Sequence, residues 1–133
     1  MITITNLVKA FGRVTAVDNV SFEAPAGQVT GFLGPNGAGK STTLRILVGL
    51  TRADSGTALI DGRRFTDLPM PGREVGVMLD ASALHPGRSG RETLRSAALL
   101  TRQPARKVDE MLERVGLETA GHKRVREYSL GMR

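Results

Sequence analysis

The sequence predicts an α/β fold built around a phosphate-binding loop, and three consecutive features predict it. Residues 29–33 form a short, mostly apolar run of the kind found in buried parallel strands. Residues 34–42 match the pattern G-x-x-x-x-G-K-[ST], the Walker A motif or P-loop. Residues 43–50 are apolar on nearly all sides, as in a helix buried against a sheet. Strand, loop and helix therefore follow one another in the order that phosphate binding requires.

The composition fits a single soluble domain. The 133 residues are 40% hydrophobic and 24% charged, which excludes disordered and fibrous classes. No apolar stretch has the length of a membrane span, and the N-terminal segment lacks the apolar run of a secretion signal. We therefore expect a chain made in the cytoplasm. With no cysteine and two histidines, a disulfide framework, a thiol nucleophile and a zinc cluster are excluded.

The charge balance is basic, with 19 Lys and Arg against 13 Asp and Glu, a net charge of +6. The basic residues are spread along the chain, and one Tyr and four Phe are too few for base-stacking surfaces. We interpret the charge as a solvated surface and expect no nucleic-acid partner. The alternative, a surface for anionic partners that include a nucleotide, stays open.

The residue types in the loop suit the chemistry of holding a triphosphate. Gly37 and Gly39 permit the backbone conformations that turn successive N–H groups toward phosphates. Lys40 would reach the β and γ phosphates, and the Ser41 hydroxyl would ligate Mg²⁺. The alternative is a glycine turn with an incidental lysine. The loop residues predicted to bind nucleotide are Asn36, Gly37, Ala38, Gly39, Lys40, Ser41 and Thr42, the last at the positive end of the helix dipole.

Further strands are predicted on both sides of the loop. Around Ile4 and around Phe22, apolar and polar residues alternate with the period of half-buried strands. Residues 57–65 carry an Asp-Gly pair between extended arms, which is a strong hairpin signal. Residues 75–79 form another apolar run of strand type.

Two amphipathic helices are predicted in the second half, over residues 91–101 and 104–116. Pro104 at the start and Gly116 at the end are typical helix boundaries. The apolar stripes are interpreted as core packing. Their members are Leu94, Ala97, Ala98 and Thr101 in the first helix and Val108, Met111, Leu112 and Val115 in the second.

With its flanks, the loop resembles the nucleotide-binding domain of ATP-binding cassette (ABC) transporters. The resemblance covers essentially the whole chain and is nearest to the bacterial drug-exporter type of ATPase subunit. It implies an ATP-binding subunit that hydrolyses ATP at the cytoplasmic face of the plasma membrane and drives transport, with drug or antibiotic export as the expected direction. The segments that carry it are 34–42, Phe11-Gly12, Ala16-Val17-Asp18, Val20-Ser21-Phe22, Asp54-Ser55-Gly56-Thr57, Asp61-Gly62 and the signature-like Tyr128-Ser129-Leu130-Gly131-Met132.

The resemblance also assigns roles outside the loop. Phe11 stands where the family stacks an aromatic ring on adenine, the alternative being a packing residue in the core or at a strand end. Val17 stands where the family has an apolar contact to the nucleoside. Asp80 replaces a glutamine that touches Mg²⁺ and the attacking water, the alternative being an exposed loop aspartate. His85 lies in the loop that faces the membrane partner and is interpreted as a solvated histidine.

The signature-like segment implies a second subunit. Ser129 and Gly131 match the family's signature, whereas Leu130 and Met132 replace its first glycine and its glutamine. In the family the serine and glycine bind the γ-phosphate of an ATP held by the opposite subunit. The implied partners are therefore a head-to-tail homodimer or paired ATPase subunit, and a membrane-spanning transporter subunit.

The resemblance divides the chain into a β flank (about 1–28 and 57–66), a P-loop core (about 29–56 and 75–80) and a helical subdomain (about 88–127). The family's Walker B Asp and Glu and its switch His have no match here. The chain therefore resembles an N-terminal portion truncated before the Walker B strand, its catalytic residues are unknown, and alone it is expected to be inactive.

Two other functions stay open at this stage. One is a soluble ABC-type ATPase that acts on ribosomes or DNA, which the basic charge supports. The other is a nucleotide-binding module that does not hydrolyse ATP.

Overall fold

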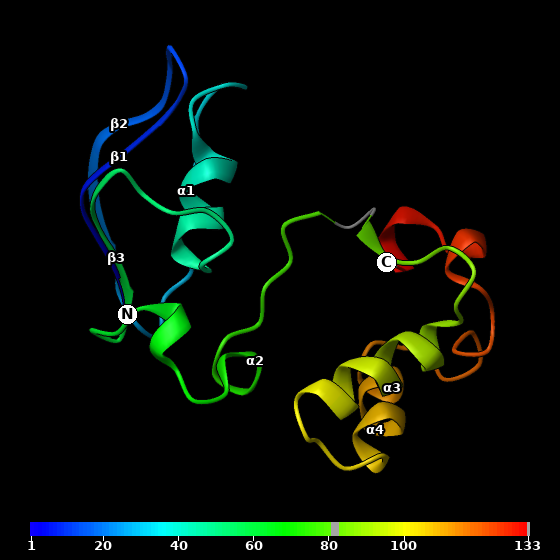
Figure 1. The fold of residues 1–133 in the computed structure, drawn as a ribbon. Helices are drawn as coiled ribbons and strands as arrows, with labels where there is room; N and C mark the ends of the chain where they lie inside the picture. Colours follow the sequence, from blue (N-terminus) through cyan, green and yellow to red (C-terminus); the bar gives the residue numbers. More distant parts are fainter. Residues whose placement is uncertain (81–82, 133) are drawn as a thin grey trace. The chain divides into compact units, whose positions relative to one another are not determined.

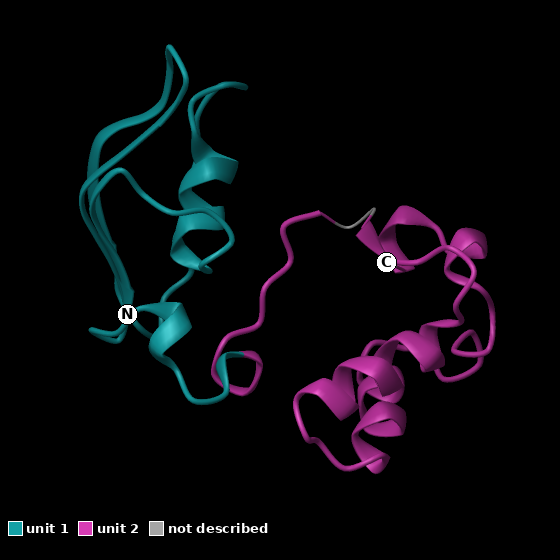
Figure 2. Ribbon diagram, viewed as in Figure 1, with its two compact units in different colours: residues 1–71 teal, residues 72–133 magenta. Residues whose placement is uncertain are grey.

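The computed structural model describes residues 1–80 and 83–132. They form two compact units, residues 1–71 and 72–133, which Figure 2 colours separately. The first unit carries the sheet and the P-loop, and the second carries the helices of the second half (Figure 1).

The first unit is built on a three-stranded antiparallel sheet in the order β2-β1-β3. Its strands are β1 (Ile2–Phe11), β2 (Val14–Ala24) and β3 (Ser55–Ile60). The helix α1 (Lys40–Leu47) packs against β2 and β3, as Figure 1 shows. The predicted strands around Ile4 and Phe22 and the predicted helix after the loop are therefore confirmed, although α1 begins at Lys40 and ends at Leu47, three residues before the expected end at Leu50.

A small apolar core lies where the sheet meets α1. Ile4, Leu7 and Val17 are its most buried members, at 2%, 0% and 3% exposure. Thr43 and Leu47 of α1 are also buried. The apolar residues packed around this core are Ile2, Val20, Phe22, Ile46, Ala53 and Ala58.

An irregularity in β1 shifts the inward-facing positions. The register between β1 and β2 changes between Ile4 and Leu7, and Asn6 has a φ of 47° there. Its side chain donates to Asn19 Oδ1 at 3.0 Å, and its backbone N–H donates to Ser21 Oγ at 2.8 Å. This bulge turns Leu7 inward three residues after Ile4, where strict alternation would place Asn6.

The predicted Asp61-Gly62 turn is confirmed. Asp61 and Gly62 have φ values of 47° and 75°, the left-handed pair that a two-residue hairpin turn of type I′ requires. Ile60 and Arg63 exchange backbone hydrogen bonds of 2.8 and 3.0 Å across it. The returning arm is only a bridge at Arg63, and the 3₁₀ helix η1 (Phe65–Asp67) follows.

Two predicted strands are wrong: residues 29–33 and 75–79 are irregular in the structure. Val29 and Leu33 are fully or almost fully exposed, at 104% and 91%, and Met78 is 72% exposed. A buried parallel strand needs neighbours to bond its backbone groups. Within residues 1–80 and 83–132, no strand pairs with either segment. Apolar composition alone therefore did not make a strand.

The second unit contains both predicted helices. α3 (Gly90–Leu100) and α4 (Arg106–Arg114) pack against each other, and the short α2 (Pro71–Glu74) begins at the boundary of the unit. The 3₁₀ helices η3 (Val125–Glu127) and η4 (Leu130–Met132) follow. In α4 the predicted stripe is partly buried, because Val108 and Leu112 are buried whereas Met111 is 42% exposed.

The start of α3 is held in two ways. Ser89 and Glu92 form a capping box, in which Ser89 Oγ accepts from the Glu92 N–H at 3.2 Å and Glu92 Oε2 accepts from the Ser89 N–H at 2.7 Å. Four backbone hydrogen bonds then join residues 86–91 to residues 121–126. They are Arg91 N to Gly121 O, Gly90 N to Lys123 O, Val125 N to Arg88 O and Arg126 N to Pro86 O.

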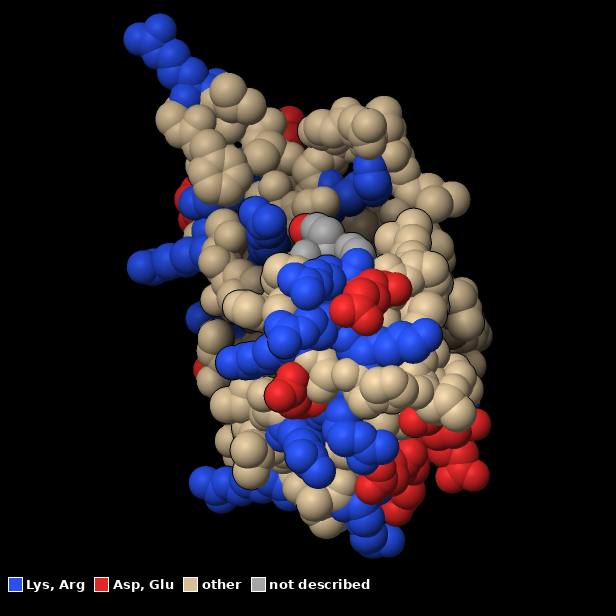
Figure 3. Space-filling view, turned by 90° about the vertical axis from the view of Figure 1, so that its right-hand side faces the viewer, with Lys and Arg blue, Asp and Glu red and all other residues tan. Residues whose placement is uncertain are grey.

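Charged side chains of both signs share the surface. Figure 3 shows Lys and Arg side chains over one face with Asp and Glu between them. Pairs on α4 include Lys107 with Glu110 at 2.7 Å and Arg106 with Glu110 at 3.4 Å. None of the helices described here is long and apolar enough to span a bilayer.

Candidate phosphate-binding site

The P-loop forms a tight turn that leads directly into α1. Gly37 and Gly39 have φ values of 85° and 80°, in the left-handed region that glycine adopts without a Cβ penalty. The Ala38 N–H donates to Pro35 O at 3.2 Å, which closes the turn. Asn36, Gly37 and Ala38 are all exposed, so the tip of the loop is open to a ligand.

Gly39 fits against the backbone of β2. A Cβ atom at this position would lie 2.1 Å from the Ala16 carbonyl oxygen and 3.3 Å from a methyl group of Val17. Gly39 is therefore required for close packing as well as for its left-handed φ. The pattern in the sequence indicates the glycine, but not the strand it packs against.

Lys40 is the first residue of α1, and its ammonium reaches back over the loop. Nζ donates to Gly34 O at 2.6 Å and to Pro35 O at 2.7 Å. An ammonium has three N–H donors, so one remains for a phosphate oxygen. The charge is thus held at the mouth of the loop by the loop's own carbonyl groups.

The first turn of α1 leaves its positive end uncovered. No side chain caps its N-terminus, and the turn contains no acidic residue. Helix N-termini with free N–H groups favour anions. Ser41 is exposed beside Lys40, Thr42 is half-buried, and Thr43 is 1% exposed and belongs to the core. The exposed Ser41 hydroxyl is an oxygen donor in this turn, and its role as a Mg²⁺ ligand stays a prediction.

Phe11 and Val17 have different environments. Phe11 ends β1 opposite Val14, is 55% exposed, and has Lys9 Nζ 5.3 Å from its ring centroid. Its exposed ring weighs against the alternative of core packing. Val17 is 3% exposed and lies beneath Gly39, so its side chain supports the loop from inside the unit. Their contacts to a nucleotide stay predictions.

Asp54 holds the end of β1, a role that the sequence did not indicate. Lys9 Nζ donates to Asp54 Oδ1 at 2.8 Å, and the Ala10 N–H donates to Oδ2 at 2.7 Å. The hydrogen bond from Lys9, followed by that from the Ala10 amide, lowers the pKa of Asp54 below its usual value. These bonds fix the two residues that precede Phe11.

The remaining predicted site residues belong to the second unit. Asp80 is exposed at the end of an irregular segment, Ser129 is exposed, and Gly131 lies in η4. Tyr128, which precedes them, is buried, and its hydroxyl donates to Ala120 O at 2.9 Å. No group of three or more His, Asp or Glu residues is gathered as a metal site within the part of the chain that the structure describes.

The chain matches the family described as ABC transporter over residues 17–133. It belongs to the ABC transporter family. A solved structure described as an ATP binding subunit of an ABC transporter has a TM-score of 0.76 and 25% identity, over 99% of this chain and 57% of that one. The fold of the present chain is therefore the α/β fold of an ABC ATP-binding domain, with the antiparallel sheet and the helices described above.

Named ABC relatives include an import protein and a lantibiotic transport protein. The uncharacterized ABC transporter ATP-binding protein YhcH of Bacillus subtilis is 37% identical over all of this chain and 44% of its own length. The sulfate/thiosulfate import protein CysA of Nocardia farcinica is 34% identical over 100% of this chain and 41% of its own. The lantibiotic transport protein SrtF of Streptococcus pyogenes is 32% identical over 100% of this chain and 57% of its own length. The chain spans about half the length of these ABC relatives.

Proposed function

We propose that this chain binds ATP with Mg²⁺ through residues 34–42 as part of the ATP-binding subunit of an ABC transporter. The observation that carries the proposal is the joint geometry of Gly39 and Lys40. The glycine seats the loop on β2, and the ammonium is held by Gly34 O and Pro35 O beside an uncapped helix start. A polyphosphate would find backbone N–H groups, one lysine charge and a helix dipole directed at the same place.

Each residue of the site has a proposed role. Lys40 contacts the β and γ phosphates, and the amides of Asn36, Gly37, Ala38 and Gly39 surround them. Ser41 holds Mg²⁺, which would neutralise the phosphate charge during transfer. The Thr42 N–H extends the positive end of α1.

The contacts beyond the loop are proposed from the resemblance and from exposure. Phe11 stacks on adenine, which its 55% exposed ring permits. Val17 makes an apolar contact to the nucleoside, and its side chain also packs next to Gly39. Asp80 is a second oxygen ligand for Mg²⁺, and its carboxylate suits a hard cation.

The partners are proposed at the level of the whole protein. Ser129 and Gly131 would complete the ATP site of an opposite subunit in a head-to-tail dimer, a homodimer or a paired ATPase subunit. A membrane-spanning subunit would be the second partner, at the inner face of the plasma membrane. The division into β flank, P-loop core and helical subdomain is part of this proposal.

Export of a drug or antibiotic is the proposed direction. The lantibiotic transport relative supports an antibiotic as the transported substrate, whereas the sulfate/thiosulfate relative is an import protein. Hydrolysis is proposed for the whole protein, because phosphoryl transfer also needs a group that orients the attacking water. Steady-state phosphate release by this chain alone is expected to be negligible.

A nucleotide titration tests the ATP proposal. Lys40→Ala is expected to weaken MgATP binding at least about tenfold, because a charged hydrogen bond to phosphate is lost. Ser41→Ala should weaken binding only when Mg²⁺ is present. Arg45→Ala is the matched control, since Arg45 is an exposed cation on the same helix. Equal affinity in Lys40→Ala and the control would remove the loop from the proposal.

A further inference from the structure

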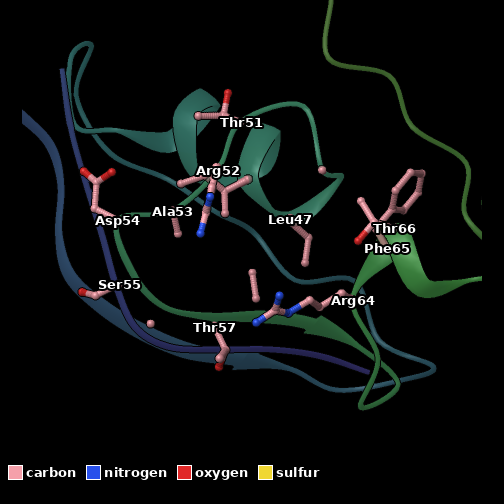
Figure 4. Close-up of a pocket in the computed structure, with 14 residues that line it drawn as sticks. Leu47, Thr51, Arg52, Ala53, Asp54, Ser55, Thr57, Arg64, Phe65 and Thr66 are labelled. Atoms are coloured by element: carbon pink, nitrogen blue, oxygen red, sulfur yellow. The ribbon is translucent and has the colours of Figure 1, made fainter.

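The first unit contains a cavity that shares no residue with the P-loop. It has a volume of about 380 Å³ and lies between the C-terminal end of α1, β3 and η1 (Figure 4). This volume is within the range of small-molecule sites. Leu47, Ala53 and Ala58 give the cavity an apolar floor.

Two arginines are directed into this cavity from different segments. Arg52 follows α1 and Arg64 precedes η1, and Figure 4 shows both guanidinium groups extending into the same space. Neither guanidinium makes an ion pair or hydrogen bond to any residue that the structure describes. Two like charges that face one cavity repel each other, and a shared anion would relieve that repulsion.

The carboxylate in the wall does not neutralise these arginines. Asp54 is the acidic residue among the described residues that line the cavity. Its two oxygens accept from Lys9 Nζ and from the Ala10 N–H, and Figure 4 shows the carboxylate at the edge of the cavity. The cavity therefore keeps an excess of positive charge.

Two glycines in the wall are closely packed against other segments of the first unit. A Cβ at Gly49 would lie 2.7 Å from a methyl group of Thr66, and a Cβ at Gly56 would lie 2.2 Å from Asn6 O. Gly49, which follows α1, packs against η1, and Gly56 of β3 packs against the backbone at the bulge of β1. The contact of Gly49 with Thr66 thus holds the segment that carries Arg52 close to η1, which follows Arg64.

We propose that this cavity is a second anion site, which binds a small molecule carrying a phosphate or carboxylate group between Arg52 and Arg64. Guanidinium groups match both oxyanions through paired N–H donors. The apolar floor of Leu47, Ala53 and Ala58 would contact the carbon skeleton of such a ligand. The site is independent of ATP binding at residues 34–42.

The test is calorimetric titration with sodium phosphate and, separately, with disodium succinate, at constant ionic strength set by sodium chloride. It is made in a Lys40→Ala background, so that phosphate binding at the P-loop does not contribute. Replacing Arg52 and Arg64 by alanine is expected to weaken at least one of the two anions about tenfold or more. Which anion is affected identifies the ligand class.

Arg45→Ala serves as the matched control, because it removes one exposed cation from the same unit outside the cavity. Amide NMR shifts at Gly49, Gly56 and Thr66 should follow the anion in the control and not in the double variant. Both arginines are exposed, so their replacement should not prevent folding. Unchanged affinity for both anions in the double variant, or an equal loss in the control, overturns the proposal.

Discussion

Gly39 of the P-loop lies directly against the Ala16 carbonyl of β2, where a Cβ atom would approach the oxygen to 2.1 Å. The loop is therefore fitted to the sheet at one point in its backbone. Gly37, two residues earlier, has nearly the same φ but no heavy atom within 4 Å of its Cβ position. Gly37 is therefore needed for its left-handed φ alone, whereas Gly39 is needed both for its left-handed φ and for close packing against β2.

Alanine at these positions should have unequal effects. Gly37→Ala places a side chain at positive φ in open space and should cost about 1 kcal/mol of folding free energy. Gly39→Ala adds a backbone clash and should cost about 1–3 kcal/mol more. Urea unfolding of both variants measures the difference. Equal losses would mean that Gly39 is not fitted against Ala16.

Phe11→Ala is expected to lower ATP affinity by about 1 kcal/mol and to leave stability almost unchanged, because the ring is 55% exposed. Phe11→Tyr retains an aromatic face and should bind ATP like the unmodified protein. Fluorescent-nucleotide titration and thermal unfolding of each variant separate the two effects. A lower melting temperature with unchanged affinity would identify Phe11 as a packing residue instead.

Acidification is expected to loosen the start of α3. The Ser89 backbone N–H, and then its hydroxyl, hydrogen-bond to Glu92 and lower the pKa of Glu92 below its usual value. A depressed folded-state pKa means that this stabilisation is present at neutral pH and is lost as the pH falls below about 4. Glu92→Gln should therefore reduce the pH dependence of the free energy of unfolding at acidic pH.

Ser89→Ala should remove about 1 kcal/mol at neutral pH through loss of the N-cap. Glu118→Gln is the matched control for the pH experiment, since Glu118 is exposed. If Glu92→Gln and Glu118→Gln change the acidic pH dependence of the free energy of unfolding equally, the capping box is not the cause of that dependence.

Gly90→Ala should destabilise the second unit by about 1–3 kcal/mol, because the new Cβ would lie 2.2 Å from the Tyr128 hydroxyl oxygen. Tyr128→Phe removes that oxygen together with the hydrogen bond to Ala120 O. In the Tyr128→Phe background, Gly90→Ala should therefore cost less. A double-mutant cycle of unfolding free energies measures this coupling, and additive losses would contradict it.

Local sequence signals predicted the elements that depend on local physics. The Asp61-Gly62 turn, α3 and α4 could be predicted because turn residues, helix-boundary residues and helical periodicity are all recognisable within a short stretch of sequence. The residues 29–33 and 75–79 were misjudged because a strand depends on its neighbours as well as on its own composition.

The candidate site divides in the same way. The loop residues from Asn36 to Thr42 were predictable from one motif. The fit of Gly39 on Ala16 and the bonds from Lys9 and Ala10 to Asp54 join positions more than 20 residues apart, and no local pattern encodes such pairs. The bulge at Asn6 carries a faint signal, since asparagine tolerates positive φ.

The four backbone hydrogen bonds between residues 86–91 and 121–126 have a consequence for how the signature-like segment fluctuates. Together with the Tyr128 hydroxyl on Ala120 O, they attach the chain just before Ser129 to the start of α3. Hydrogen exchange with solvent at the Gly90, Arg91 and Val125 amides requires these bonds to break. The three amides should therefore share one opening free energy, so that Ser129 gains freedom only when the first turn of α3 opens with it.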